Sequence, residues 1–181
     1  MRASGLHTFV ALGLAFAGCA TAPKTASERS ALDTRAEATL QSMRSADLGL
    51  DALLASAYGY AVFPEIGKGG LIAGAAYGRG VVYEKGRLTG YVELNQGSLG
   101  AQIGAQTFAE LIVFRDRTEL QRLKAGNFSL SGNVSAIALT TGAAASARLS
   151  DPVAVFVMPR GGLMAELTVS GQQINFQPKG G

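Results

Sequence analysis

Two apolar runs around a two-residue turn constrain the fold of this chain most. The stretch "GVVYEKGRLTGYVEL" covers residues 80–94, and Lys85-Gly86 separates its two runs. A two-residue connection favours a β-hairpin and fixes the register of its strands. Counting outward from the turn places three pairs opposite each other: Glu84 with Arg87, Tyr83 with Leu88, and Gly80 with Tyr91. We expect an ion pair, an apolar contact and a glycine covered by an aromatic ring, respectively.

Signals for β-structure continue on both sides of this hairpin. Gly59 and Pro64 bracket the apolar run "YAVF", and "AELIVF" (residues 109–114) is a continuous apolar run typical of a buried strand. Residues 128–135 alternate between apolar and polar side chains, which predicts a strand with one polar face. The alternation slips near residues 136–137, where we expect a β-bulge.

Three helices are predicted, two of them before the first strand. Apolar side chains recur every three or four residues from about Ser30, at Leu32, Ala36, Leu40 and Met43. A second helix is expected over Leu48–Ala57, with Asp47 as its N-cap. A third, short helix follows the 109–114 run, because Thr118 and Gln121 have capping-box spacing and Gly126 closes the turn.

An internal resemblance bears on the architecture. The stretch "AVFPEIGKGGLIAGAAYGRGVVY" beginning at Ala61 resembles "AVFVMPRGGLMAELTVSGQQINF" beginning at Ala154. Two similar strand-turn-strand units predict a pseudo-symmetric sheet that is closed or strongly curved, and they would place Lys68 and Arg160 in equivalent loops. The expected fold is therefore α+β, a curved or closed antiparallel sheet with N-terminal helices and one short helix between strands.

The N-terminus has the pattern of a secretory signal. Arg2 precedes an apolar run over residues 9–17, which is too short to span a bilayer as a stable helix. Its end, "FAGC", resembles the lipobox of bacterial lipoproteins and makes Cys19 the expected acylated N-terminus; an ordinary cleaved signal with a free cysteine is the alternative. Ala20 after the cysteine favours the outer membrane. We expect a signal peptide over 1–18, an acylated cysteine and tether over 19–29, and one domain over 30–181.

Loss of the signal would remove most catalytic chemistry. His7 is the only histidine and Cys19 the only cysteine, so the mature chain would lack Ser-His-Asp and Cys-His catalysis and His/Cys zinc sites. Acids such as Glu65, Glu84, Glu93, Glu110, Asp116 and Glu166 are scattered singly among the predicted strands and turns. Without the clustered carboxylates of a calcium loop, no metal or other cofactor is expected. We expect no enzyme, although two distant acids meeting in space stay an alternative.

Charge and glycine pattern also exclude nucleic-acid and nucleotide binding. Removal of Arg2 leaves 15 basic against 13 acidic residues, which is far from the strong basicity of a nucleic-acid binder. "GKGGLIAGAAYGRG" has the glycine spacing of a P-loop, but Ala75 and Ala76 stand where Lys and Ser/Thr would serve the phosphates. The glycines are interpreted instead as sites of bulges and close strand contact.

Four stretches together resemble the SYLF-domain family. They are "YAVFPEIGKGGLIAGAAYGRGVVY", "GSLGAQIGAQTFAELIVF", "LKAGNFSLSGNVSAIAL" and "GGLMAELTVSG", and the resemblance covers roughly residues 48–176. It implies a compact α+β domain that binds membranes through anionic head groups, phosphoinositides in eukaryotic members, with no known catalytic machinery. Actin binding is not implied, because the eukaryotic actin-binding segment has no clear counterpart here.

Basic residues in glycine-rich turns are the candidate lipid-binding residues. They are Lys68, Arg160, Arg79, Lys85 and Arg87, with a second cluster of Arg115, Arg117, Arg122 and Lys124. A cation near an anionic surface contributes about 1 kcal/mol, whereas a solvated surface charge or surface ion pair contributes little. The sequence therefore predicts an envelope lipoprotein whose domain binds anionic phospholipid. The alternative is an envelope adaptor that binds a protein partner.

Overall fold

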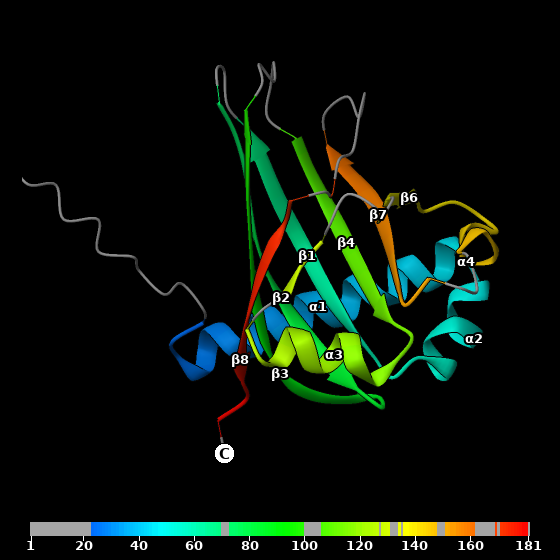
Figure 1. Cartoon of the computed structure of the whole chain (residues 1–181), viewed down its shortest axis with the longest axis horizontal. Helices are drawn as coiled ribbons and strands as arrows, with labels where there is room; N and C mark the ends of the chain where they lie inside the picture. Colours follow the sequence, from blue (N-terminus) through cyan, green and yellow to red (C-terminus); the bar gives the residue numbers. More distant parts are fainter. Residues whose placement is uncertain are drawn as a thin grey trace, which may run out of the picture.

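The computed structural model describes residues 23–69, 73–99, 106–126, 128–130, 134, 136–147, 151–161, 169 and 171–180. Within them the chain forms one eight-stranded sheet with helices packed against it (Figure 1). In chain order the elements are α1 (Ala26–Ala46), α2 (Gly49–Ser56), β1 (Gly59–Gly69), β2 (Ala73–Glu84), β3 (Arg87–Leu99), β4 (Gln106–Phe114), α3 (Arg117–Lys124), β5 (Phe128–Ser129), β6 (Ala136–Ala138), α4 (Ala143–Ser146), β7 (Val153–Gly161) and β8 (Gln173–Pro178). The predicted α+β fold is confirmed.

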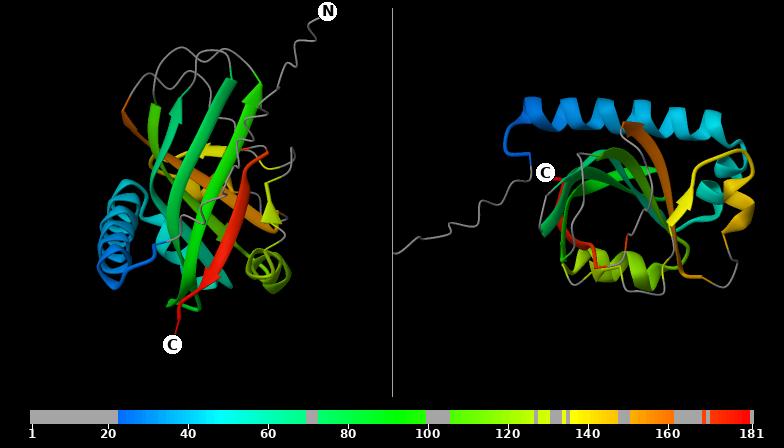
Figure 2. Two further views of the ribbon diagram at one scale, coloured as in Figure 1. Left: turned by 90° about the vertical axis from the view of Figure 1, so that its left-hand side faces the viewer. Right: turned by 90° about the horizontal axis from the view of Figure 1, so that it is seen from above.

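The sheet is curled and buries side chains on both faces (Figure 2). Its strand order is β5-β8-β3-β2-β1-β4-β7-β6, antiparallel except where β6 runs parallel to β7. Helix α1 lies along the convex face, where Leu40 and Met43 pack with Val62 and Phe156. Helix α3 closes the concave side with Leu120 and Leu123, which join a second apolar cluster. The apolar interior of the curl is thus separate from the helix-covered outer face.

Helix α1 buries the predicted stripe but begins earlier than expected. Leu32, Ala36, Leu40 and Met43 are all buried, as their spacing predicts. The helix starts at Ala26, because the Thr25 side chain accepts the Glu28 N–H and the Glu28 carboxylate accepts the Thr25 N–H. This capping box places the first turn of the domain inside the segment expected to be tether.

The hairpin is confirmed, and its register is shifted by one bulge. Lys85 and Gly86 have φ values of 50° and 74°, the left-handed geometry of a two-residue turn. Glu84 faces Arg87 and Tyr83 faces Leu88 as predicted. An irregularity between Val82 and Tyr83 then pairs Gly80 with Val92 and Val81 with Tyr91. The predicted pairing of Gly80 with Tyr91 is therefore wrong, because counting from the turn assumes an uninterrupted ladder.

Two local contacts around the hairpin also differ from expectation. The ion pair of Glu84 is with Lys124 on α3, which lies close enough to take the place predicted for Arg87. The ring that covers Gly80 is that of Phe63 on the neighbouring strand β1. Pro64 does not end β1; it lies at a register irregularity between Val62 and Glu65, a position that tolerates the missing N–H.

The helix after β4 is confirmed with a different cap. Asp116 occupies the N-cap position of α3, and its carboxylate accepts the Glu119 N–H at 2.9 Å. Thr118 lies inside the first turn, so the predicted Thr118–Gln121 capping box is wrong. The closing turn at Gly126 is confirmed by its φ of 79°.

The predicted strand over 128–135 and its bulge divide between opposite edges of the sheet. Only Phe128–Ser129 form a strand, β5, which pairs with β8. The next strand, β6, pairs with β7 at the far edge. The apolar pattern slips near residue 136 because the chain crosses between these edges, so the predicted bulge is wrong. Residues 131–133 and 135 lie outside the described residues.

Asp47 connects the two short outer helices. It stands one residue before the N-cap position of α2, where its carboxylate accepts the Gly49 N–H at 3.0 Å. The same carboxylate accepts the Ala144 N–H of α4 at 2.6 Å. Among the described residues, no helix has the length and apolar character needed to cross a membrane.

Candidate functional site

Lys68 and Arg160, predicted to share equivalent loops, lie within strands and face opposite sides of the sheet. Lys68 is in β1 opposite Ala76, an inner-face residue, and is 5% exposed. Arg160 is an exposed residue of β7, and its guanidinium donates to Thr39 Oγ1 of α1 at 2.6 Å. The prediction of equivalent loops is therefore wrong.

The two similar stretches are out of phase relative to the sheet faces. Ala61 belongs to the inner apolar cluster, whereas Ala154, its counterpart in the second stretch, belongs to the outer one. Both stretches do form strands, and β1 and β7 both pair with β4. The two similar sequences therefore form similar local structure but have different environments, because a one-residue offset places every side chain on the other face of the sheet.

Arg79 lies among acidic residues on β2. Glu65 and Glu93 are its cross-strand partners, and its Nε donates to the Tyr77 hydroxyl at 3.0 Å. That hydrogen bond, with contributions from Glu28 and Glu93, raises the pKa of Arg79 above its ordinary value. The surroundings of Arg79 thus favour its charged form.

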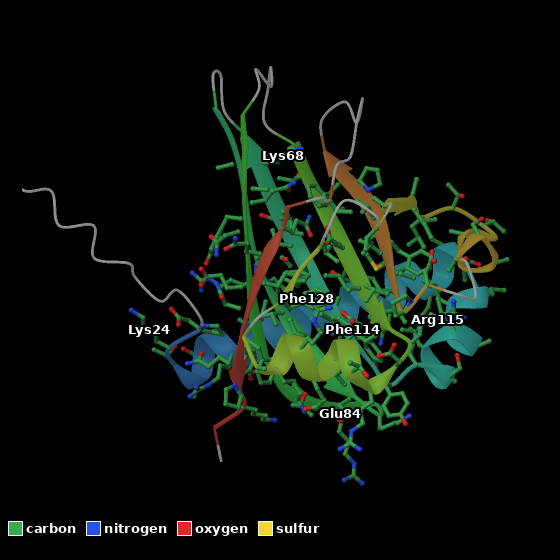
Figure 3. All side chains as sticks on the ribbon, viewed as in Figure 1. Lys24, Lys68, Glu84, Phe114, Arg115 and Phe128 are labelled. Atoms are coloured by element: carbon green, nitrogen blue, oxygen red, sulfur yellow. The ribbon has the colours of Figure 1, made fainter. Side chains whose placement is uncertain are left out.

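Lys85 and Arg87 are exposed together at the tip of the β2–β3 hairpin. The Lys85 Nζ lies 3.9 Å from the ring centroid of Tyr58, a cation–π contact. Tyr58 is 37% exposed. We call Tyr58, Lys85, Gly86 and Arg87 the tip surface. Figure 3 shows Glu84, beside this surface, at the opposite end of the sheet from Lys68.

Backbone hydrogen bonds position the tip surface. The Tyr58 N–H donates to the Phe114 carbonyl at the end of β4, and the Lys85 N–H donates to the Tyr58 carbonyl. The aromatic ring and the turn are therefore held together by the ends of two neighbouring strands. Sequence reasoning missed Tyr58; its signal was a tyrosine directly before Gly59, at the junction of a predicted helix and strand.

The second basic cluster, around α3, is partly neutralised. Arg122 donates to both oxygens of Glu119, and Lys124 pairs with Glu84. Arg117 is exposed at the first position of α3.

The structure divides the five candidate lipid-binding residues among three places: the inner face (Lys68), the outer face (Arg79, Arg160) and the tip (Lys85, Arg87).

Glu110 is a buried acid whose environment the sequence did not reveal. It is completely buried, and burial raises its pKa from 4.5 to about 7, while a hydrogen bond from Gln172 lowers it. Its hydrogen-bonding partner is an amide and not a second carboxylate. Among the described residues, no group of three or more His, Cys, Asp or Glu side chains is placed to hold a metal ion.

Comparison with known proteins adds the family. Residues 95–179, from the second half of β3 through β8, match the family model Ysc84, described as "Las17-binding protein actin regulator". The SYLF-family resemblance is confirmed over these residues. The chain is also 27% identical over 154 residues to a SYLF-family protein, Beta cell expansion factor A of Aeromonas veronii. That match covers 83% of this chain and 58% of the relative, so the chain spans less than two thirds of its length.

The SYLF family is one of binding and adaptor domains. The tip surface precedes the matched range in sequence, since Tyr58, Lys85 and Arg87 all come before residue 95. The strands that carry the tip nevertheless belong to the same sheet as the matched strands. The SYLF match and the tip surface are therefore parts of one folded unit.

Proposed function

We propose that this chain is a bacterial envelope lipoprotein, acylated at Cys19 and held in the outer membrane, whose SYLF domain binds anionic phospholipid through the tip surface. The observation that carries the proposal is the exposed Tyr58 ring with Lys85 directly over it and Arg87 across the same turn. Phosphate groups attract both cations, and an amphipathic tyrosine ring suits the boundary between head groups and acyl chains.

The energetics of a single patch are modest. Each cation near an anionic surface contributes about 1 kcal/mol. The Arg87 guanidinium also offers a planar set of donors that matches a phosphate group. An acyl anchor at Cys19 would hold the domain near the bilayer at high effective concentration, so a weak patch would suffice. Tether and patch would then act together.

The other candidates contribute less in this arrangement. Arg160 and Arg79 already donate hydrogen bonds to Thr39 and Tyr77, which a lipid phosphate would have to displace. Lys68 is buried on the inner face and reaches a head group only if the surrounding chain moves. We therefore assign the primary contact to Lys85 and Arg87.

Vesicle co-sedimentation tests the proposal. The chain from Ala20 onward, which includes every described residue, is mixed with phosphatidylglycerol or phosphatidylcholine vesicles at low and high salt. We expect binding to the anionic vesicles only, weakened by salt because screening acts on exposed charges. The variant Lys85→Glu/Arg87→Glu is expected to lose binding.

A matched control separates the tip from net charge. Arg29→Glu/Arg35→Glu on α1 changes the net charge by the same amount and should retain most of the binding. Arg79→Glu/Arg160→Glu tests the outer-face candidates in the same way. Equal loss in all three variants would refute a specific role for the tip, and absence of binding by the unmodified chain would refute phospholipid binding by the domain.

The alternative function is that of an envelope adaptor. It is favoured by the name of the matching family, "Las17-binding protein actin regulator", which describes a protein-binding regulator. An adaptor would show salt-insensitive association with a partner and no affinity for protein-free vesicles.

Membrane fractionation and palmitate labelling of the full chain and of the Cys19→Ala variant test the lipid anchor separately. We expect the Cys19→Ala chain to carry no palmitate and to appear in the soluble fraction.

A further inference from the structure

Glu110 lies on the inner face of β4, an interior strand of the sheet. It lies in β4 with Phe63 of β1 and Val157 of β7 as its cross-strand partners, and all three residues are completely buried. The inner-face residues on either side of it along β4 are Phe108 and Ile112. A carboxyl group at this position is surrounded by apolar side chains, so its charged form is strongly disfavoured.

The hydrogen bond of Glu110 crosses the interior of the curl. Gln172 Nε2 donates to Glu110 Oε2 at 3.0 Å. In the sheet, β8 and β4 are separated by β3, β2 and β1, so a bond from the residue before β8 to β4 spans the concave side (Figure 2). It is a tie between two walls of the curl and not a bond between neighbouring strands.

Gln172 in turn holds the edge of the sheet. Its backbone carbonyl accepts the Leu130 N–H at 3.0 Å, and the Leu130 carbonyl accepts the Gly171 N–H at 2.8 Å. Leu130 directly follows β5, which pairs with β8. One side chain therefore links the β5–β8 edge to the interior strand β4.

Two buried oxygen atoms at this tie, Oε1 of Glu110 and Oε1 of Gln172, have no hydrogen-bond partner among the described residues. A carboxylate offers no donor to the amide oxygen, whereas a neutral carboxylic acid carries one O–H. With that proton, acid and amide can each donate one hydrogen bond to the other. A single proton thus supplies the donor that the two remaining atoms lack.

Among the described residues, no cation lies next to Glu110 to stabilise its ionised form. β1 presents Phe63, β7 presents Val157, and the segment before β8 presents Gln172. Lys68, the inner-face cation of β1, lies beyond Ile66 and opposite Gln106, farther along both strands. Burial and Gln172 are accordingly the causes of the perturbed pKa of Glu110.

We propose that Glu110 and Gln172 form a proton-controlled latch, in which the neutral pair holds the β5–β8 edge against β4 and ionisation of Glu110 favours release of that edge. Release would expose the inner apolar cluster, including Phe108 and Ile174. The latch goes beyond the proposed function and does not depend on the tip surface. It can be tested without lipid.

Amide hydrogen exchange of the whole chain from Ala20 onward, corrected for intrinsic rates, measures the opening of β8 as a function of pH. A carboxyl with a pKa of about 7 when closed and 4.5 when exposed makes the opening constant rise up to about 300-fold between those pH values and then level off. We expect this rise at residues 173–177 and a much smaller one at the β1–β2 amides. A flat profile at β8, or an equal rise in β1–β2, would overturn the latch.

Two variants keep the test independent of folding defects. Glu110→Gln imitates the neutral acid in shape, and its β8 opening should lose the pH dependence while the fold is kept. Gln172→Leu removes the tie, so β8 opening should increase already below pH 4.5. A direct ¹³C NMR titration of the Glu110 carboxyl completes the test. Titration at the ordinary pKa, or retained pH dependence in Glu110→Gln, would contradict the proposal.

Discussion

Gly80 lies where the curled sheet has no room for a side chain. A Cβ placed on it would lie 2.6 Å from the Val62 carbonyl oxygen and 2.9 Å from Phe63 Cδ1, and both of these β1 residues are completely buried. A backbone oxygen in a central strand cannot move without disturbing the ladders on either side. Gly80→Ala should therefore act as an overpacking substitution, which typically costs about 1–3 kcal/mol.

Gly67 provides the matched control for Gly80. It lies in β1, and a Cβ placed on it meets no atom of the described part of the chain within 4 Å. Gly67→Ala should be neutral or stabilise by up to about 1 kcal/mol, because glycine in a strand costs conformational entropy. Urea denaturation followed by circular dichroism measures both variants. Equal stability of the two would refute the assignment of Gly80 as a forced close approach between β1 and β2.

Three further predictions concern single side chains. Because burial raises the pKa of Glu110 to about 7, the free energy of unfolding should fall as pH rises from 4.5 to about 7. Glu110→Gln should remove this pH dependence in urea melts, and above pH 7 it should be more stable than the unmodified chain by up to about 3 kcal/mol. The Ala144 N–H lowers the pKa of Asp47 below 3.8, so the stabilisation by the Asp47 carboxylate is present above pH 3.8 and is lost at lower pH. Asp47→Ala should therefore lower the free energy of unfolding by about 1–3 kcal/mol at neutral pH in the same melts. Asp116→Ala should cost about 1 kcal/mol as a lost N-cap, whereas Thr118→Ala should cost much less, as thermal melts of both variants would show.

Sequence patterns predicted the elements that depend on local chemistry. The Lys85-Gly86 turn, the apolar stripe of α1 and the buried run over 109–114 all appear where their residues predict them. Each of these signals is contained in a short window, either a turn with positive φ or a hydrophobic period. The α+β class followed from their sum.

Features that depend on distant contacts were not predictable in this way. The bulge beside Val82 changes the pairing of Gly80, and no residue near the turn announces it. The crossing from β5 to β6 imitates a bulge, since both shift the apolar phase. Lys68 and Glu110 are buried because they belong to the alternate residues of β1 and β4 that point to the inner side of the curl. Which set of alternate residues points inward is known only once the whole sheet is assembled.

The candidate site shows the same limit. Lys85 and Arg87 were identified from their turn, but Tyr58 joins them only because α2 ends beside the hairpin. Lys68 and Arg160 lie in similar sequences, but sequence similarity carries no information on which face of the sheet each side chain occupies. A basic residue in a glycine-rich stretch is therefore a candidate whose exposure has to be read from the fold.

The most direct test of the central claim places a probe on each end of the domain. Cys19 is the only cysteine, so the chain from Ala20 onward accepts a unique environment-sensitive fluorophore at Ser56→Cys, close to Tyr58, or at Asn95→Cys, an exposed position toward the end of β3 that is away from the tip surface. Membrane contact through the tip predicts a blue-shifted emission at position 56 with anionic vesicles and an unchanged emission at position 95. A shift at position 95 alone, or at neither position while the protein is bound, would contradict the account.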